Sequence, residues 1–522
     1  MFHAFRQRLA QGALGFGALV FAALAAAGPA QAGWLKAESE RFIVYSDGNA
    51  NQLRRFTQEL ESFDRLLRVR MGLNLDEATY RKLPIYLVGS SSGINKVSPG
   101  SGDAIAGFYL ATDEDIFGIA TRDGDMHTLK HEYAHHFMMQ NFSFAYPAWF
   151  IEGFAEYFAT AEFKSDEIHI GKYHENRAYW LVNGSWTPMD DLLSSRPKQS
   201  TRHRETYYPL AWLLTHWFMS DTERRTSLSA YLADVGGGGD SVEAMQRATG
   251  LAPAELQRTL RRYMNNRMSY VVMKTSFDAA EVAITPMPRS ADDLLLLNQR
   301  LMISTPEDQR AATVRDVRRA AARHPDDPLA LLALGHAELH FGDRTAAEAP
   351  LMRLLELHPN HVEGLQYLAR ARMEAAAEQD DAEAALRLRQ EAQAFLARAY
   401  REDDVNYATL LLIAENRAGE PGYPNDNDLT VLTHAYQLAP QLGVVRVNLA
   451  QALLGRGRNA EAIVLLEPVV NNPHGEAGYA RTLLARAKGE SDVEDETSTP
   501  VEIGAAQAEA APDDASDAAP ET

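Results

Sequence analysis

The chain has 522 residues, of which 46% are hydrophobic and 23% charged, and its formal net charge is -20 at pH 7. This length exceeds what one hydrophobic core usually serves, so we expect two or three folded domains. The lack of cysteine excludes disulfides, thiolate metal ligands and a cysteine nucleophile. The negative charge argues against a nucleic-acid partner, although the stretch from Glu490 to Thr522 alone holds eleven acidic residues and no Lys or Arg.

Residues 1–32 have the pattern of a cleaved secretory signal peptide. Arg6 and Arg8 precede an apolar run rich in Ala and Gly, which ends in small residues at Ala32. A membrane anchor is the alternative, but Pro29 breaks the run and no comparable apolar stretch follows. We therefore expect export to the periplasm with cleavage after Ala32, and no transmembrane helix in the mature chain.

The segment 33–288 alternates between strand-like and helix-like patterns, which is typical of an α+β domain. Alternating apolar residues predict strands, and apolar residues at helical spacing predict amphipathic helices. The predicted strands are Arg41–Ser46, Leu83–Ser90 and Asp115–Thr121, and the predicted helices are Asn51–Val69, Asp125–Met139 and Pro147–Thr160.

The segment 289–488 is dominated by Ala, Leu and Arg in successive helical patterns. Two units in it have nearly equal length: Pro325 to Pro359 is a step of 34 residues, and Pro440 to Pro473 a step of 33. Their shared residue pattern, LAxALxxxGRxxEAIxxLE, resembles the tetratricopeptide repeat family. An ordinary helical bundle is the alternative; a repeat solenoid implies a protein partner on its concave face.

The last segment, 489–522, is a run of Ala, Pro, Asp and Glu with few apolar residues. Such a composition buries too little surface to offset the entropy lost on ordering. We expect it to be a disordered acidic tail.

An HExxH motif lies in one of the predicted helices, where His131 and His135 flank Glu132 and two further residues. On a helix, residues four apart lie on one face about 5–6 Å apart, so two imidazoles can hold one metal ion. Glu132 lies beside this face, where it can take a proton from an attacking water as a general base. A surface helix whose histidines face water is the alternative.

Two glutamates, Glu152 and Glu156, lie four residues apart in the next predicted helix. Sixteen residues separate His135 from Glu152, enough for a turn and an antiparallel return. A catalytic zinc takes three protein ligands and one open position, and His, His and Glu is one recognised set. We therefore expect Glu152 to complete a site for one Zn²⁺ per chain, and Glu156 to accept the outer N–H of a ligating histidine.

The segments HEYAHH and WFIEGFAEYF together resemble the gluzincins, the superfamily of thermolysin and the zinc aminopeptidases, and in particular the peptidase MA-like domains often fused to tetratricopeptide repeats. The resemblance covers about Gly33 to Asn266 and implies a thermolysin-like zinc peptidase fold. The roles that it assigns are zinc ligation to His131, His135 and Glu152, the base to Glu132, and the supporting acid to Glu156. No GxMEN-like segment precedes the helix, so an endopeptidase is favoured over an aminopeptidase.

A donor for the developing oxyanion is also expected, often a Tyr or His from a later segment. The segment RHRETYYPLAW offers Tyr208, Tyr207 and His203. Tyr208 begins a Tyr-x-x-Ala-Trp pattern that resembles the later tyrosine of the family, so we favour it; a core tyrosine is the alternative. His136 points about 100° away from His135 around the helix, which favours a packing role.

The segments AGFYL and DIFGIAT resemble the loop and edge strand along which gluzincin substrates lie as an added strand. Gly107, Phe108 and Tyr109 are the candidate substrate contacts, and His127, one turn before His131, is expected to line the cleft. The sequence therefore predicts an exported zinc metallopeptidase that acts on a polypeptide. The alternatives are a non-catalytic periplasmic scaffold with a relic peptidase domain, and hydrolysis of another amide, such as one in the cell wall.

Overall fold

The computed structural model describes residues 33–76, 81–100, 105–122, 126–142, 145–194, 204–266, 268–303, 305–472 and 478–490. The predicted signal peptide, the candidate His203 and the predicted tail beyond Glu490 lie outside these residues. None of the described helices is both long enough and apolar enough to cross a bilayer.

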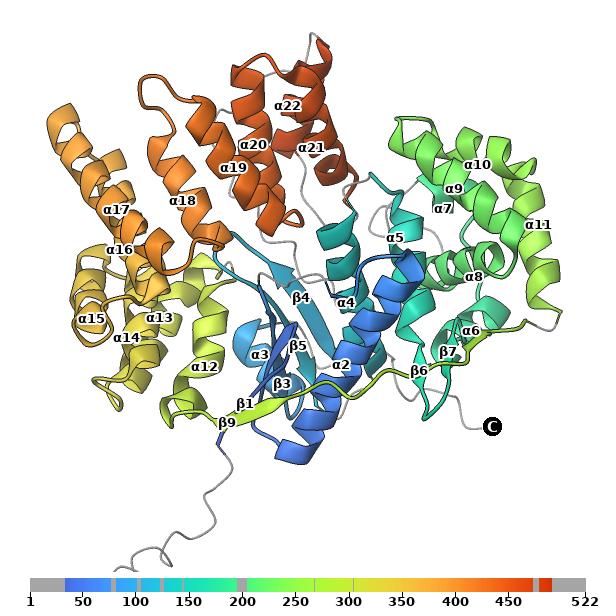
Figure 1. Cartoon of the computed structure of the whole chain (residues 1–522), viewed down its shortest axis with the longest axis horizontal. Coiled ribbons are helices and arrows are strands. Elements are labelled where there is room, and N and C mark those ends of the chain that lie inside the picture. The colour runs from blue at the N-terminus through green and yellow to red at the C-terminus, as the bar shows by residue number, and fades with distance from the viewer. Residues whose placement is uncertain are drawn as a thin grey trace, which may run out of the picture.

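A six-stranded mixed sheet lies at the centre of the molecule (Figure 1). Its strand order is β4-β5-β3-β2-β1-β9, with β2, β3 and β5 parallel and the outer pairs antiparallel. The strands are β1 (Leu35–Glu38), β2 (Phe42–Ser46), β3 (Leu83–Val88), β4 (Gly107–Ala111), β5 (Ile116–Thr121) and β9 (Ala283–Pro286). A second sheet joins β6 (Glu162–Phe163), β7 (Ile168–Ile170) and β8 (Val271–Met273).

Helices of the first region cover this sheet and extend beyond it. Asn49 caps the long α2 by accepting hydrogen bonds from two backbone N–H groups, and Gly72 ends it in the left-handed conformation at φ 71°. The helices are α2 (Ala50–Met71), α3 (Ser91–Val97), α4 (Met126–Asn141), α5 (Ala148–Ala159), α6 (Glu175–Asn183), α7 (Met189–Ser194), the 3-10 turn η1 (Arg204–Thr206), α8 (Tyr207–Met219), α9 (Thr222–Gly236), α10 (Ser241–Thr249) and α11 (Pro253–Met264).

The second region consists of successive packed helix pairs, so the predicted all-α repeat region is confirmed. The pair α14 and α15 begins at Pro328 and the next pair, α16 and α17, at Val362, a step of 34 residues that is typical of tetratricopeptide repeats. The helices are α12 (Ser290–Leu301), α13 (Glu307–Ala321), α14 (Pro328–Phe341), α15 (Arg344–Leu357), α16 (Val362–Ala377), α17 (Ala382–Glu402), α18 (Tyr407–Arg417), α19 (Asp426–Leu438), α20 (Gly443–Gly455), α21 (Asn459–Asn471) and α22 (Gly478–Lys488).

The two regions share their apolar cores. Leu295 of α12 packs in one cluster with Tyr86 of β3, and Tyr407 and Leu438 belong to the large cluster that also holds Trp149 of α5. In Figure 1 the helix pairs rise from α12 beside the sheet to α20–α22 above β4 and α4. The repeats therefore form one wall around the central region instead of a separate appendage.

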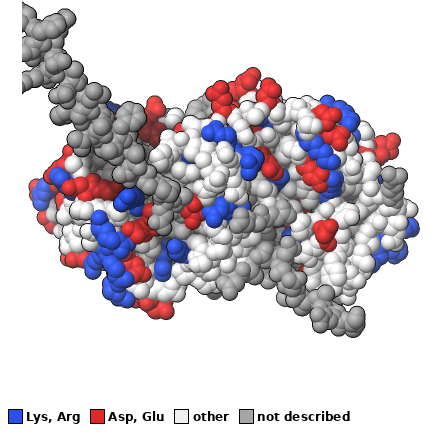
Figure 2. Space-filling view, turned by 90° about the horizontal axis from the view of Figure 1, so that it is seen from below, with Lys and Arg blue, Asp and Glu red and all other residues white. Residues whose placement is uncertain are grey.

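The charges on the surface are mixed. On the face that Figure 2 shows, basic and acidic side chains are interspersed among uncharged ones, in the middle as well as on both flanks. Neither sign dominates among the described residues of this face, so they form no continuous basic path for a nucleic-acid backbone.

The predicted strands and helices of the first region agree with the structure to within a few residues, but one assignment is wrong. We expected AGFYL to end a loop and Asp115–Thr121 to be the edge strand. In the structure, Gly107–Ala111 is the edge strand β4, while β5 is paired on both sides. The segment GFYLA places Phe108 and Leu110 on one face, as a strand does, and the short turn 112–115 lets this strand fold back on β5.

Candidate metal centre

Three side chains from two adjacent helices meet in the interior. His131 and His135 lie one turn apart on α4, and Glu152 faces them from α5, which packs between α4 and α8. Glu152 is fully buried, and the two histidines are 2% and 5% exposed. Gly153 allows α8 to approach α5 closely, because a Cβ there would lie 2.2 Å from Thr215 Oγ1 and 2.5 Å from the Ala211 carbonyl oxygen. The close packing of α5 holds Glu152 in place.

The three candidate ligand atoms form a nearly regular triangle. The Nε2 atoms of His131 and His135 are 3.0 Å apart, and Glu152 Oε2 lies 3.4 Å from each of them. Ligands at about 2.0–2.1 Å from a tetrahedral zinc lie roughly 3.3 Å from one another. Two imidazole nitrogens and one carboxylate oxygen at these distances fit zinc, and the donor set leaves a fourth position for substrate or water.

A buried carboxylate supports the outer side of His131. Glu156 Oε1 lies 3.4 Å from His131 Nδ1, and Arg177 donates two hydrogen bonds to the Glu156 carboxylate. Burial alone would raise the pKa of Glu156, but Arg177 and His131 outweigh it and lower the pKa to about 2. Glu156 is therefore an anion placed to receive the Nδ1–H of His131, which leaves Nε2 as the ligand atom.

His127 lines the same interior one turn before His131. Its Nε2 lies 3.8 Å from Glu156 Oε2, and its ring lies 4.5 Å from that of His174. Burial lowers the pKa of His127 to about 4, so its imidazole is neutral near pH 7. By contrast the pKa of His131 is raised, because the carboxylates of Glu152 and Glu156 outweigh the effect of burial.

The candidate base and the candidate oxyanion donor lie beside the triangle. Glu132 follows His131 on α4 and is 8% exposed. Tyr208, in the first turn of α8, has its ring 6.4 Å from that of His131, and the Arg177 guanidinium lies 5.5 Å from its ring centre. Tyr207 is fully buried, and besides burial the nearby Glu152 carboxylate raises its pKa, so both tyrosines lie near the triangle.

The edge strand β4 runs beside α4. The Tyr109 hydroxyl lies 2.9 Å from His136 Nδ1, so His136 joins α4 to β4 and is no member of the ligand triangle. Phe108 is 1% exposed and packs in the core on the other side with Ile94 and Tyr86, so its expected contact with a substrate is wrong. Alternate side chains of a strand point to opposite faces, which explains why Tyr109 and Phe108 separate.

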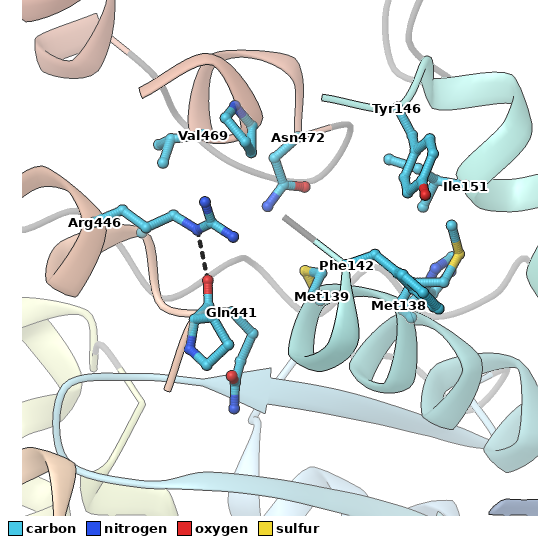
Figure 3. A pocket seen from close by; sticks show the side chains of 13 residues that line it. Met138, Met139, Phe142, Tyr146, Ile151, Gln441, Arg446, Val469 and Asn472 are labelled. Carbon is cyan, nitrogen blue, oxygen red and sulfur yellow. Dashed lines mark hydrogen bonds between the residues drawn. The ribbon is translucent and has the colours of Figure 1, made fainter. Parts of the chain in front are cut away.

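A cleft opens at His135 and has walls from both regions (Figure 3). Met138, Met139 and Phe142 of α4 and the following segment form one wall. The second wall comes from the repeats and includes Val469 and Arg446. Arg446 is 5% exposed and its Nε donates to the Pro440 carbonyl oxygen. Its Nη1 is buried and has no hydrogen-bond acceptor among the described residues.

Sequence reasoning did not find Arg177 or Arg446. Arg177 lies 21 positions from Glu156 and Arg446 lies more than 300 from His135, and neither belongs to a recognisable motif. Only the packing of α6 on α8 and of α20 over the cleft brings them to the site.

No protein-family model matches the chain, and no curated protein matches it. Among solved structures, a thermophilic TPR protein from Thermus thermophilus is 23% identical with a TM-score of 0.32, covering 38% of this chain and 98% of that one. A tetratricopeptide repeat protein from Parabacteroides merdae is 14% identical with a TM-score of 0.28, covering 51% and 88%. MamA is 16% identical with a TM-score of 0.25, covering 32% and 90%. The repeat architecture therefore follows from the packing of the helix pairs in this chain, and the candidate metal centre from the positions of its side chains.

Proposed function

We propose that this protein is a zinc-dependent metallopeptidase whose metal is held by His131, His135 and Glu152. The observation that carries the proposal is the buried triangle of two Nε2 atoms and one carboxylate oxygen, with sides of 3.0, 3.4 and 3.4 Å, next to a glutamate on the same helix. Structural zinc sites usually have four protein ligands, whereas three ligands and an adjacent carboxylate are typical of a hydrolytic site.

The residues around the triangle supply the remaining parts of a hydrolytic mechanism. When bound, zinc supplies Lewis acidity, which polarises a carbonyl and acidifies water. Glu132 accepts the proton of the attacking water and delivers it to the leaving amine. Tyr208 borders the site from α8 and is the candidate donor to the developing oxyanion.

The surroundings of the site favour a polypeptide as the substrate. The edge strand β4 lies beside α4, and an extended peptide can pair with such an edge while its side chains enter the cleft. The cleft is lined by Met138, Met139 and Phe142, which accept an apolar side chain, and its far wall belongs to the repeats. We propose that the repeats bind the substrate protein or a partner that presents it. A cleft lined by both regions and an edge strand that a chain can follow favour an endopeptidase.

The first experiment measures bound metal and cleavage in the purified chain. Wild type and Glu132→Gln are loaded with zinc, and casein or a peptide library is incubated with each. Glu132→Gln keeps the ligands, so it should bind zinc as wild type does while the rate falls by about 10²–10⁴-fold. Glu152→Gln should lose zinc from this site together with activity. The signal-like N-terminus adds export to the proposal, which cell fractionation tests.

Two outcomes would contradict the proposal. Equal cleavage by wild type and Glu132→Gln would place the activity elsewhere or in a contaminant. Equal zinc content in wild type and Glu152→Gln would show that the three residues do not bind zinc. The protein would then be a non-catalytic repeat scaffold.

A further inference from the structure

A second group of two histidines and a glutamate lies where the repeats meet the β4–β5 turn. His336 and His340 lie one turn apart on α14, and Glu114 reaches them from the turn. Glu114 Oε2 lies 3.1 Å from His336 Nε2, and Glu114 Oε1 lies 2.8 Å from His340 Nε2. We infer that these three side chains bind a second zinc ion, which joins the repeat region to the edge of the central sheet.

The hydrogen bonds of Tyr367 determine which atom of His336 faces the carboxylate. The Tyr367 hydroxyl donates to Glu114 Oε2 at 3.0 Å and also lies 3.0 Å from His336 Nδ1. Because the single hydroxyl proton is used on the carboxylate, Nδ1 must be the donor to the tyrosine oxygen. In the neutral ring Nε2 then carries a lone pair and points at a carboxylate oxygen. Two acceptors at this distance need a positive charge between them, either a proton on the ring or a metal ion.

The geometry of the group meets the needs of a metal. His336 is fully buried and the His340 side chain is 21% exposed. Neither Nε2 has a hydrogen-bond partner of acceptable angle among the described residues, although both lie near the carboxylate. One ligand atom from each of the three side chains lies within 4.8 Å of the other two. Two imidazoles and a carboxylate suit zinc, and the exposed side of His340 leaves room for water as a fourth ligand.

The neighbouring arginine does not fill this role. Arg370 Nη2 is 3.0 Å from Asp113 Oδ2, whereas its Nε is 3.8 Å from Glu114 Oε1, too far for a hydrogen bond. Arg370 therefore pairs with the preceding residue of the turn and leaves the inner face of Glu114 to the histidines.

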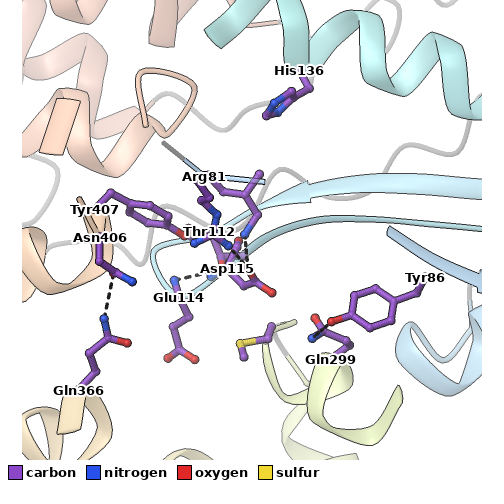
Figure 4. A network of polar contacts seen from close by, with 12 residues as sticks. Arg81, Tyr86, Thr112, Glu114, Asp115, His136, Gln299, Gln366, Asn406 and Tyr407 are labelled. Carbon is purple, nitrogen blue, oxygen red and sulfur yellow. Dashed lines mark hydrogen bonds and ion pairs between the residues drawn. The ribbon is translucent and has the colours of Figure 1, made fainter. Parts of the chain in front are cut away.

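The position of the group indicates what the metal would do. The turn 112–115 is held by the repeats at several points. Tyr407 donates to the Thr112 carbonyl oxygen (Figure 4). Arg370 pairs with Asp113, and Glu114 faces His336 of α14. The same turn connects β4, the edge strand beside the candidate peptidase site, to β5. A zinc ion here would fix the repeats, and with them the outer wall of the cleft, relative to β4.

The test counts zinc ions in the full-length chain. The variant His131→Gln/His135→Gln removes the candidate peptidase site, so that the two sites are distinguished. This chain is stripped with a chelator, dialysed against zinc chloride and analysed by mass spectrometry of the metal. We expect about one zinc ion per chain to remain, and to be lost when His340→Gln is added. Wild type should then bind about two, and His340→Gln alone about one.

A matched control is available in the turn after α13. His324 Nε2 lies 2.9 Å from Asp293 Oδ2 and its side chain is 20% exposed, close to the value for His340, but no third ligand accompanies this pair among the described residues. His324→Gln should leave the zinc content unchanged. Loading with Co²⁺ gives a second measure. Tetrahedral cobalt absorbs visible light, so its absorbance detects an occupied site directly and does not depend on how stable each variant is.

The result that would overturn the inference is a His131→Gln/His135→Gln chain that is folded, as circular dichroism shows, and binds neither zinc nor cobalt. A proton would then lie between His336 and Glu114. If the proposed peptidase site binds no zinc, the pattern is different. Wild type then binds one ion, which is absent from His340→Gln and present in His135→Gln.

Discussion

Arg177 holds Glu156 by two hydrogen bonds, from Nε to Oε2 at 3.0 Å and from Nη2 to Oε1 at 2.7 Å. Glu156 in turn lies 3.4 Å from His131 Nδ1. All three side chains are buried, so the arginine fixes the carboxylate and the carboxylate fixes the imidazole before a metal binds. The orientation of His131 therefore depends on a residue of α6 that is not one of the three candidate ligands.

Removing the charge of Glu156 should weaken zinc binding at His131. Glu156→Gln keeps the shape of the side chain but loses the anion that orients and polarises the imidazole, so we expect the Kd for zinc to rise about 10–100-fold. Competition with a chromophoric chelator measures it. Glu175→Gln, an exposed glutamate on the same helix as Arg177, should change nothing. Equal affinities in Glu156→Gln and wild type would show that the Glu156 carboxylate has no role in zinc binding.

Filling the space at Gly153 should destabilise the protein. A Cβ at this position would overlap Thr215 Oγ1 and the Ala211 carbonyl, so Gly153→Ala forces α5 and α8 apart. Overpacking of this kind costs about 1–3 kcal/mol, which thermal melting detects. Gly236→Ala on α9 is the control, because no heavy atom lies within 4 Å of its Cβ. A Gly153→Ala chain as stable as the Gly236→Ala chain would mean that the two helices can separate freely.

Local patterns predicted the parts of the structure that depend on near neighbours. The apolar spacing predicted α2, α4 and α5, since a helix repeats its face every three to four residues. The spacing of His131 and His135 predicted that they share one face, and the structure places Glu152 opposite them. The step of 34 residues predicted the helix pairs of the repeats for the same reason.

Features that depend on distant pairing were not predicted. The return of β9 to pair with β1 joins segments about 250 residues apart. The carboxylate beside the second histidine pair on α14 comes from Glu114, more than 200 positions earlier, whereas Glu338, between the two histidines, pairs with Arg318. Neither Arg177 nor Arg446 belongs to a sequence motif that would indicate a role in the site, because both reach it only through helix packing.

Arg446 should select substrates with a carboxylate, provided that the cleft is the peptidase site. Its Nη1 is buried in the cleft wall without an acceptor among the described residues, and a substrate carboxylate can supply one. For peptides with an acidic side chain, Arg446→Met should raise KM about 10-fold or more, while neutral peptides are cleaved as before. Arg456→Met, at the exposed end of the same helix, is the control. An equal change for acidic and neutral peptides would contradict this role.

Glu415 should make the protein less stable as the pH rises. Burial raises the pKa of Glu415 from 4.5 to about 7, with Asp113 adding to the effect and Arg370 opposing it. The folded chain therefore holds a proton that the unfolded chain releases between these values, so stability is greatest below the unfolded pKa and falls as pH approaches 7. Glu415→Gln removes this cost and should be more stable than wild type by up to about 3 kcal/mol at pH 8, with little difference at pH 4.5. Denaturant unfolding at the two pH values measures it, with the exposed Glu402→Gln as control. A difference of the same size at both pH values would show that Glu415 is ionised throughout.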